Sequence, residues 1–176
     1  MEPARRLPMT EEEFLQIPES LDHIELIDGE VHMAPAPTFD HQNVLLRLVR
    51  LVDAWARANP PAVAAFSPLD IRMAPGRILQ PDAMLWLGGL ADRSSPITTI
   101  PDLVVEVLSG KPSYDRLTKK LIYFEAGVRE YWIVDPILKT FEIAHGLETR
   151  APSREPVFST VAPGLQVDPE EIFREG

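Results

Sequence analysis

A single glutamate interrupts an otherwise apolar segment of this sequence. Glu106 lies between the apolar runs 103–105 and 107–108, in a stretch whose length and composition are typical of a buried strand. Burial of an isolated carboxylate costs roughly several kcal/mol unless a cation or hydrogen bonds compensate it. Two interpretations therefore stand: Glu106 faces water on an edge strand, or it is a metal ligand or a catalytic acid.

A second carboxylate, Asp82, falls in the preceding strand-like segment. On a strand it would share a face with Gln80 and Met84. Asp82 follows Pro81, and aspartates near proline are common in turns, so a loop position is the ordinary explanation. Two carboxylates on successive sheet segments, however, are the kind of oxygen ligands that Mg²⁺ binds together with water and phosphate. We therefore treat Asp82 and Glu106 as candidate metal ligands.

The third candidate is a lysine on a predicted helix. Lys119 points away from the apolar stripe of that helix, on the same side as Asp115 and Tyr123. Asp115 and Lys119 have the spacing of an ordinary i,i+4 ion pair, so periodicity alone favours a lysine that faces solvent. The expected stripe consists of Leu117, Leu121 and Phe124.

The elements that must position these residues alternate between helices and strands. Asp28-Gly29 predicts a two-residue hairpin turn, with Leu26 opposite Val31 and Ile24 opposite Met33 as an apolar face. Helices are expected at about 11–17, 40–59 and 113–126, with a helical turn after Asp168-Pro169. Strands are expected at 66–73, 78–86, 102–108, 130–135, 140–145 and, as an edge, 155–161. This order predicts an α/β fold with a mixed sheet flanked by helices.

Composition limits the class of protein. The 176 residues fit one domain spanning 1–176, and the absence of cysteine excludes disulfides and zinc-thiolate sites. We find no secretory signal and no apolar run of membrane-spanning length, so we expect a soluble, cytoplasmic protein. The net charge of −10 argues against strong nonspecific DNA binding but not against an acidic metal site. Glycine-rich phosphate loops are also absent, which disfavours nucleotide hydrolysis.

Three sequence segments together carry a resemblance to a known family. They are ELIDGEVHMAPAPTFDHQ at 25–42, QPDAML at 80–85, and PDLVVEVLSGKPSYDRLTKKLIYFEAGVREYWIVDP at 101–136. This pattern resembles the Uma-two family of endonucleases, within the PD-(D/E)xK restriction-endonuclease-like superfamily. The resemblance runs from about residue 8 to residue 173.

The resemblance implies roles for particular residues. Asp82 matches the superfamily's metal-binding aspartate and Glu106 the acidic residue of the (D/E)xK half-motif. Leu108 occupies the usual lysine position, so Lys119 on the following helix is the match, with Lys120 as its competitor. Two further matches, each with an ordinary structural explanation as well, are the upstream Glu25 and the helix-leading His41.

These roles predict metal-dependent hydrolysis of nucleic acid, with DNA favoured. Asp82 and Glu106, with Glu25 or the backbone carbonyl of residue 107, would hold Mg²⁺ or Mn²⁺. Lys119 would position the attacking water or stabilise negative charge, and His41 would transfer a proton or contact phosphate. Asp70 is at most an outer oxygen ligand.

An alternative is a catalytically inactive module that binds nucleic acid or protein on the same fold. The acidity of the chain favours this alternative, whereas the combination of Asp82, Glu106 and Lys119 disfavours it. A homodimer is a further expectation, because an exposed sheet edge near residues 130–145 could pair with a second copy.

Overall fold

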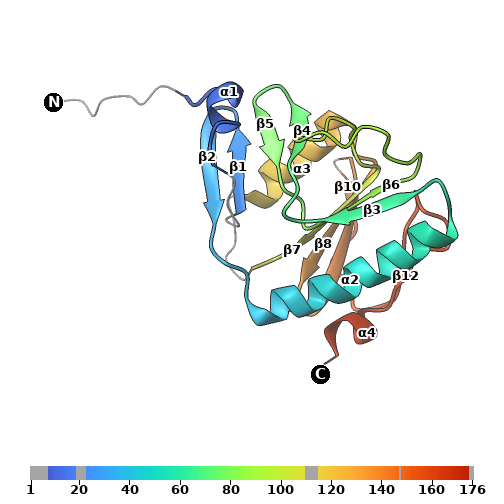
Figure 1. Ribbon diagram of the computed structural model, residues 1–176. Helices are drawn as coiled ribbons and strands as arrows, with labels where there is room; N and C mark the ends of the chain where they lie inside the picture. The colour runs from blue at the N-terminus through green and yellow to red at the C-terminus, as the bar shows by residue number, and fades with distance from the viewer. Residues whose placement is uncertain (1–7, 19–22, 110–114, 147, 175–176) are drawn as a thin grey trace.

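The computed structural model describes residues 8–18, 23–109, 115–146 and 148–174, and its architecture is two sheets with helices packed against them (Figure 1). The strand order is β2-β1-β5-β4 in the smaller sheet and β10-β9-β8-β7-β6-β3 in the larger one. A separate two-stranded ribbon pairs β11 with β12. The predicted mixed α/β fold is confirmed.

The smaller sheet begins with the predicted hairpin. Ile24 pairs with Met33 and Leu26 with Val31, which confirms the predicted register. Leu26 packs on the short helix α1, but Val31 and Met33 are 37% and 66% exposed, so the expected apolar face is covered only along β1. The elements of this part are α1 (Glu11–Phe14), β1 (His23–Ile27), β2 (Glu30–Ala34), β4 (Ile71–Ala74) and β5 (Arg77–Leu79).

The turn of that hairpin has positive φ angles, which only a few residue types adopt readily. Asp28 and Gly29 have φ values of 51° and 89°, a region that aspartate tolerates and glycine adopts freely. A Cβ atom on Gly29 would lie 2.3 Å from Cβ of Pro8, so the N-terminal segment also requires a glycine here.

The larger sheet surrounds the strand that carries Glu106. β7 pairs in parallel with β8 and antiparallel with β6, so it is an interior strand, and all five of its residues are buried. The edge-strand interpretation of Glu106 is therefore wrong. The strands of this sheet are β3 (Val63–Phe66), β6 (Ala83–Trp86), β7 (Leu103–Val107), β8 (Glu130–Asp135), β9 (Thr140–His145) and β10 (Glu148–Thr149).

The chain passes from one sheet to the other inside the segment predicted as one strand at 78–86. β5 belongs to the smaller sheet and β6 to the larger one, and Asp82 lies in a bend between them. Pro81 cannot donate a ladder hydrogen bond, which explains why the strand stops there. The predicted strand 66–73 is likewise divided between the end of β3 and β4. The prediction that Asp82 lies on a strand and shares a face with Gln80 and Met84 is therefore wrong.

Two predictions about sheet edges also need correction. Residues 157–158 form β11 (Val157–Phe158), which pairs with β12 (Gln166–Val167) rather than with an edge of the main sheet. β8 is an interior strand, and β10 covers the outer side of β9 only at Ala144 and His145, with a single further bridge from Phe141 to Ser153, so the edge expected near 130–145 is partly covered.

The helices cover opposite faces of the larger sheet. α2 (Phe39–Ala58) begins after its N-cap Thr38 and packs on one face, and α3 (Asp115–Ala126) packs on the other face (Figure 1). The short α4 (Pro169–Phe173), with Asp168 as its N-cap, contacts α2. None of the described helices is long and apolar enough to span a membrane.

The face of α3 that packs on the protein differs from the predicted one. Leu117 and Leu121 of the expected stripe are 67% and 38% exposed, whereas Ile122 and Tyr123 are buried. Lys119 is also buried, on the same side as Tyr123. The stripe prediction assumed that a lysine must face water, but this lysine has carboxylate partners inside the protein.

Candidate active site

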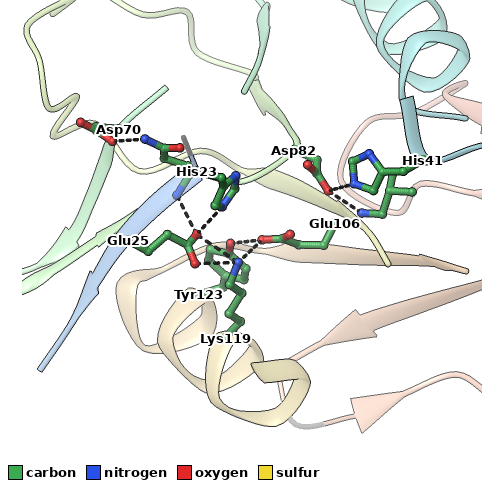
Figure 2. A network of polar contacts seen from close by, with 10 residues as sticks. His23, Glu25, His41, Asp70, Asp82, Glu106, Lys119 and Tyr123 are labelled. Atoms are coloured by element: carbon green, nitrogen blue, oxygen red, sulfur yellow. Dashed lines mark hydrogen bonds and ion pairs between the residues drawn. The ribbon is translucent and has the colours of Figure 1, made fainter. Parts of the chain in front are cut away.

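The proposed site residues converge where the two sheets meet. Glu25 comes from β1, Asp82 from the junction between β5 and β6, and Glu106 from β7. His41 extends from the first turn of α2 and Lys119 from α3, and all five side chains are buried. Figure 2 shows Lys119 between Glu25 and Glu106, with Asp82 and His41 beside Glu106.

Asp82 is held through one of its two oxygens. Its Oδ2 accepts a hydrogen bond of 2.7 Å from the backbone N–H of Val107 and lies 3.3 Å from Nε2 of His41. The Oδ1 atom has no partner among the described residues. The bend between the sheets therefore fixes the direction of this carboxylate and leaves one oxygen available.

Glu106 is held in the same way, through a single oxygen. Its Oε1 accepts a hydrogen bond of 2.5 Å from the hydroxyl of Tyr123 and lies 3.3 Å from Nζ of Lys119. The Oε2 atom has no partner within the described part of the chain. Among the described residues, the polar atoms that are both fully buried and without a partner include Nδ1 of His41. Oε2 of Glu106 and Oδ1 of Asp82 are not among these atoms, so both free oxygens have some contact with solvent-accessible space.

Glu25 differs from these two acids because both of its oxygens are engaged. Nζ of Lys119 lies 2.9 Å from Oε2 and 3.0 Å from Oε1. Oε1 also accepts a hydrogen bond of 2.9 Å from the backbone N–H of Gln80 and lies 3.3 Å from Nε2 of His23. Of the two acids that contact Lys119 in the described part of the chain, Glu25 is therefore the closer counter-ion.

One cation between two buried carboxylates drives the pKa values of the two acids apart. Burial raises the pKa of Glu106 to about 7, against the attraction of Lys119 and with the repulsion of Asp82 added. Burial opposes ionisation of Glu25 too, but Lys119 and the bonds from His23 and Gln80 lower its pKa to about 2. Near neutral pH, Glu25 is the charged partner of Lys119, while Glu106 is close to its titration point.

His41 is positioned by the start of α2. Its backbone N–H donates to Oγ1 of the N-cap Thr38 at 3.2 Å, which fixes the helix start that carries the side chain, and Nε2 of that side chain lies 3.3 Å from Asp82. Burial lowers the pKa of His41, but the hydrogen bond and charge of Asp82 outweigh burial and the net shift is upward. His41 therefore keeps its proton more readily than an ordinary histidine.

Two competing candidates lie outside this group. Nζ of Lys120 donates to Oγ1 of Thr149, on β10, whereas Lys119 reaches the carboxylates. Asp70 accepts a hydrogen bond of 2.7 Å from the side chain of Gln80, whose backbone in turn bonds Glu25. Asp70 is thus linked to Glu25 through Gln80 and is not in direct contact with it.

Sequence reasoning assigned no role to three residues that the structure brings to this site. Tyr123 contacts Glu106, and His23 and Gln80 contact Glu25. Tyr123 could have been found from its spacing of four residues after Lys119, which places both on one helical face. His23 alternates with Glu25 on β1, but nothing in the sequence distinguishes it from a solvent-facing histidine.

The available oxygens fit a small divalent cation. The described residues contain no group of three His, Cys, Asp or Glu side chains that could hold a metal ion. Mg²⁺ commonly binds through one or two carboxylates and keeps several water ligands, so Oδ1 of Asp82 and Oε2 of Glu106 are a suitable donor set. Both oxygens of Glu25 are engaged by Lys119, so Glu25 offers no free oxygen in this arrangement.

The fold, with paired carboxylates at the junction of its sheets, is that of a restriction-endonuclease-like α/β protein. Residues 11–174 match the family model described as "Uma2: Putative restriction endonuclease", and the chain therefore belongs to the Uma2 family, as the sequence motifs indicated. Family and fold together suggest a restriction-endonuclease-like nuclease.

A solved structure supports the fold assignment. The crystal structure of "a putative nuclease belonging to DUF820" from Anabaena variabilis ATCC 29413 is similar with a TM-score of 0.81, covering 94% of this chain and 98% of that chain. Sequence identity is 22%, so this similarity shows a shared fold. None of the curated proteins compared with the chain matches it.

Proposed function

We propose that this protein is an Mg²⁺- or Mn²⁺-dependent nuclease that hydrolyses phosphodiester bonds, with DNA as the favoured substrate. The observation that carries the proposal is that Asp82 and Glu106 are each held by one oxygen and each keep the other oxygen free. Buried carboxylates that serve packing alone are normally satisfied by hydrogen bonds, so two neighbouring acids that each keep an oxygen free call for another explanation.

The side chains divide the proposed chemistry among them. A divalent cation, when bound, polarises the phosphoryl oxygen and makes a bound water more acidic. Asp82 and Glu106 hold that cation, and Lys119 lies where it can stabilise negative charge on phosphate or orient the attacking water. His41, which keeps its proton readily, can donate to a phosphate or leaving oxygen. Glu25 holds Lys119 in place.

The test compares matched variants in a cleavage assay. Purified wild-type protein is incubated with supercoiled DNA, linear DNA, single-stranded DNA and RNA, in Mg²⁺, Mn²⁺ or EDTA. Asp82→Asn and Glu106→Gln should lose metal-dependent cleavage, because each replaces a charged ligand with a neutral one of similar shape. Asp70→Asn, which alters a nearby acid outside the metal pair, should stay within about tenfold of wild type.

The same assay decides between the nuclease and the alternative of a catalytically inactive binding module. The net charge of −10 favours that alternative. Absence of cleavage by the wild type on every substrate contradicts the nuclease proposal and supports the module. Cleavage that survives both Asp82→Asn and Glu106→Gln contradicts the proposed site, even if the protein is a nuclease.

A further inference from the structure

We infer that Tyr123 is a positioning residue of this site, whose hydroxyl holds the Glu106 carboxylate so that only one oxygen is offered to the cation. The inference rests on the proposed function, because it concerns how the proposed metal ligand is oriented. Tyr123 does not contact the proposed metal position itself; it acts through Glu106.

The geometry gives Tyr123 the shortest contact with Glu106. The Tyr123 hydroxyl lies 2.5 Å from Oε1, whereas Nζ of Lys119 lies 3.3 Å from the same atom. Lys119 is closer to Glu25, at 2.9 and 3.0 Å. Among the described residues, Lys119 contacts both acids and lies closer to Glu25, whereas the hydroxyl of Tyr123 donates to Glu106 alone.

The surroundings of Tyr123 keep its hydroxyl in place. Its side chain is fully buried, and its ring packs edge-on against the ring of Tyr131, with centroids 5.1 Å apart and planes at 63°. Ile122 and Val128 belong to the same apolar cluster. A ring held in this way cannot follow the carboxylate if it rotates, so the hydroxyl defines one carboxylate orientation.

This orientation matters because a glutamate carboxylate can turn about its last bond. With the hydroxyl in place, Oε1 is satisfied and Oε2 remains free toward the accessible side. Without the hydroxyl, Lys119 is the only remaining partner of Glu106 in the described residues, and either oxygen can turn toward it. Loss of hydrogen bonds that orient metal ligands commonly weakens metal affinity about 10–100-fold.

A tyrosine that merely fills the core would behave differently from a positioning tyrosine. Tyr123→Phe separates the two roles, because it keeps the ring and its edge-on contact while removing only the hydroxyl. A matched control is Thr160→Val, which removes a hydroxyl that donates at 2.8 Å to Glu130, a fully buried carboxylate remote from the site. Both changes remove one side-chain donor from a buried carboxylate.

The experiment is an Mn²⁺ titration by calorimetry on wild type, Tyr123→Phe, Thr160→Val and Asp82→Asn, each first shown to be folded by thermal unfolding in EDTA. Tyr123→Phe should bind Mn²⁺ about 10–100-fold more weakly than wild type, and Thr160→Val should bind like wild type. In cleavage assays, Tyr123→Phe should need a higher metal concentration for half-maximal rate and recover at saturating metal.

The outcomes separate the inference from the function on which it rests. If Tyr123→Phe binds within twofold of wild type while Asp82→Asn loses binding, the positioning role is overturned and the metal site stands. If wild type does not bind Mn²⁺, or Asp82→Asn binds equally well, the proposed site itself is overturned. A Tyr123→Phe rate that is lower by the same factor at every metal concentration indicates a merely structural role and also overturns the inference.

Discussion

At the scale of single residues, the central feature is one buried lysine between two carboxylates. Lys119 contacts Glu25 at 2.9 Å and Glu106 at 3.3 Å, whereas its neighbour Lys120 contacts Thr149. Two adjacent lysines with almost equal burial thus have different partners. The sequence alone could not decide between Lys119 and Lys120 as the site lysine, and substituting each in turn now provides a matched pair of variants.

Lys119→Met should reduce cleavage about 10²–10³-fold, because it removes a positive charge from the place where the proposed reaction would develop negative charge. Lys120→Met should leave cleavage within a few-fold of wild type, since that lysine does not reach the carboxylates. Single-turnover rates at saturating Mn²⁺ measure both effects. Equal losses in the two variants would mean that general helix damage, not a local charge, is responsible.

The raised pKa of Glu106 predicts how stability depends on pH in the absence of metal. Because its pKa is about 7 in the folded state and 4.5 ordinarily, the folded protein keeps a proton that the unfolded chain releases between these values. Stability in EDTA should therefore fall as pH rises from about 4.5 to 7, by at most about 3 kcal/mol.

Urea unfolding of wild type and Glu106→Gln at pH 5, 6, 7 and 8 measures this contribution. The variant should show a shallower fall, because its side chain does not titrate. His23 and His41 have raised pKa values and lose stability in the same direction above about 6.5. The charge of Glu106 contributes to both shifts, so the histidine contributions also shrink in the variant and add to the difference between the two profiles. Parallel pH profiles would contradict the assigned shift.

At the scale of elements, α3 buries the face that carries both Lys119 and Tyr123. Ile122 is 3% exposed and packs in the cluster between α3 and the larger sheet, whereas Leu117 is 67% exposed. Ile122→Ala should therefore destabilise the protein by about 2–5 kcal/mol, and Leu117→Ala by less than about 0.5 kcal/mol. Urea unfolding measures both. A larger loss in Leu117→Ala would show that the helix packs by the other face.

Sequence patterns identified most elements but not the way they are divided between sheets. The hairpin at Asp28-Gly29, the long second helix and the strand around Glu106 follow from local turn chemistry and periodicity, which depend on neighbouring residues only. The passage between sheets at Gln80–Asp82 does not, because both halves of 78–86 read as strand and the choice of partner is a long-range property.

The candidate site was predicted residue by residue from family motifs, and its convergence is a property of the fold. Glu25, His41, Asp82, Glu106 and Lys119 are brought together as the motifs imply. What the motifs could not supply is the partner of each oxygen. The buried side of α3 was also predicted wrongly, since helical periodicity assigns lysine to water unless its counter-ion on another element is known.

At the scale of the whole molecule, the proposed nuclease is an acidic protein acting on an acidic polymer. With a net charge of −10, the protein should have little attraction for phosphates without a cation. Binding of a fluorescent DNA duplex in EDTA at 150 mM salt should therefore be weak, with a shallow dependence on salt. Mn²⁺ should raise the affinity of Lys119→Met, which keeps both proposed metal ligands, by about tenfold or more.

Fluorescence anisotropy at several salt concentrations measures this directly. Tight binding in EDTA with a steep salt dependence would reveal a set of phosphate contacts that the overall charge does not predict. Asp82→Asn in Mn²⁺ is the control, because it should show no gain in affinity when the metal is added.

The ion pair of Lys119 also has a consequence for how the molecule is made. Lys119 and Glu25 are 94 positions apart in the chain, whereas Lys119 and Glu106 are only 13 apart. Closing this longer loop costs more entropy than closing the loop between Lys119 and Glu106, and Glu25 leaves the ribosome well before Lys119 exists. An unfinished chain thus carries Glu25 and Glu106 without the lysine that pairs with them, so the proposed site can be assembled only after Lys119 has been synthesised.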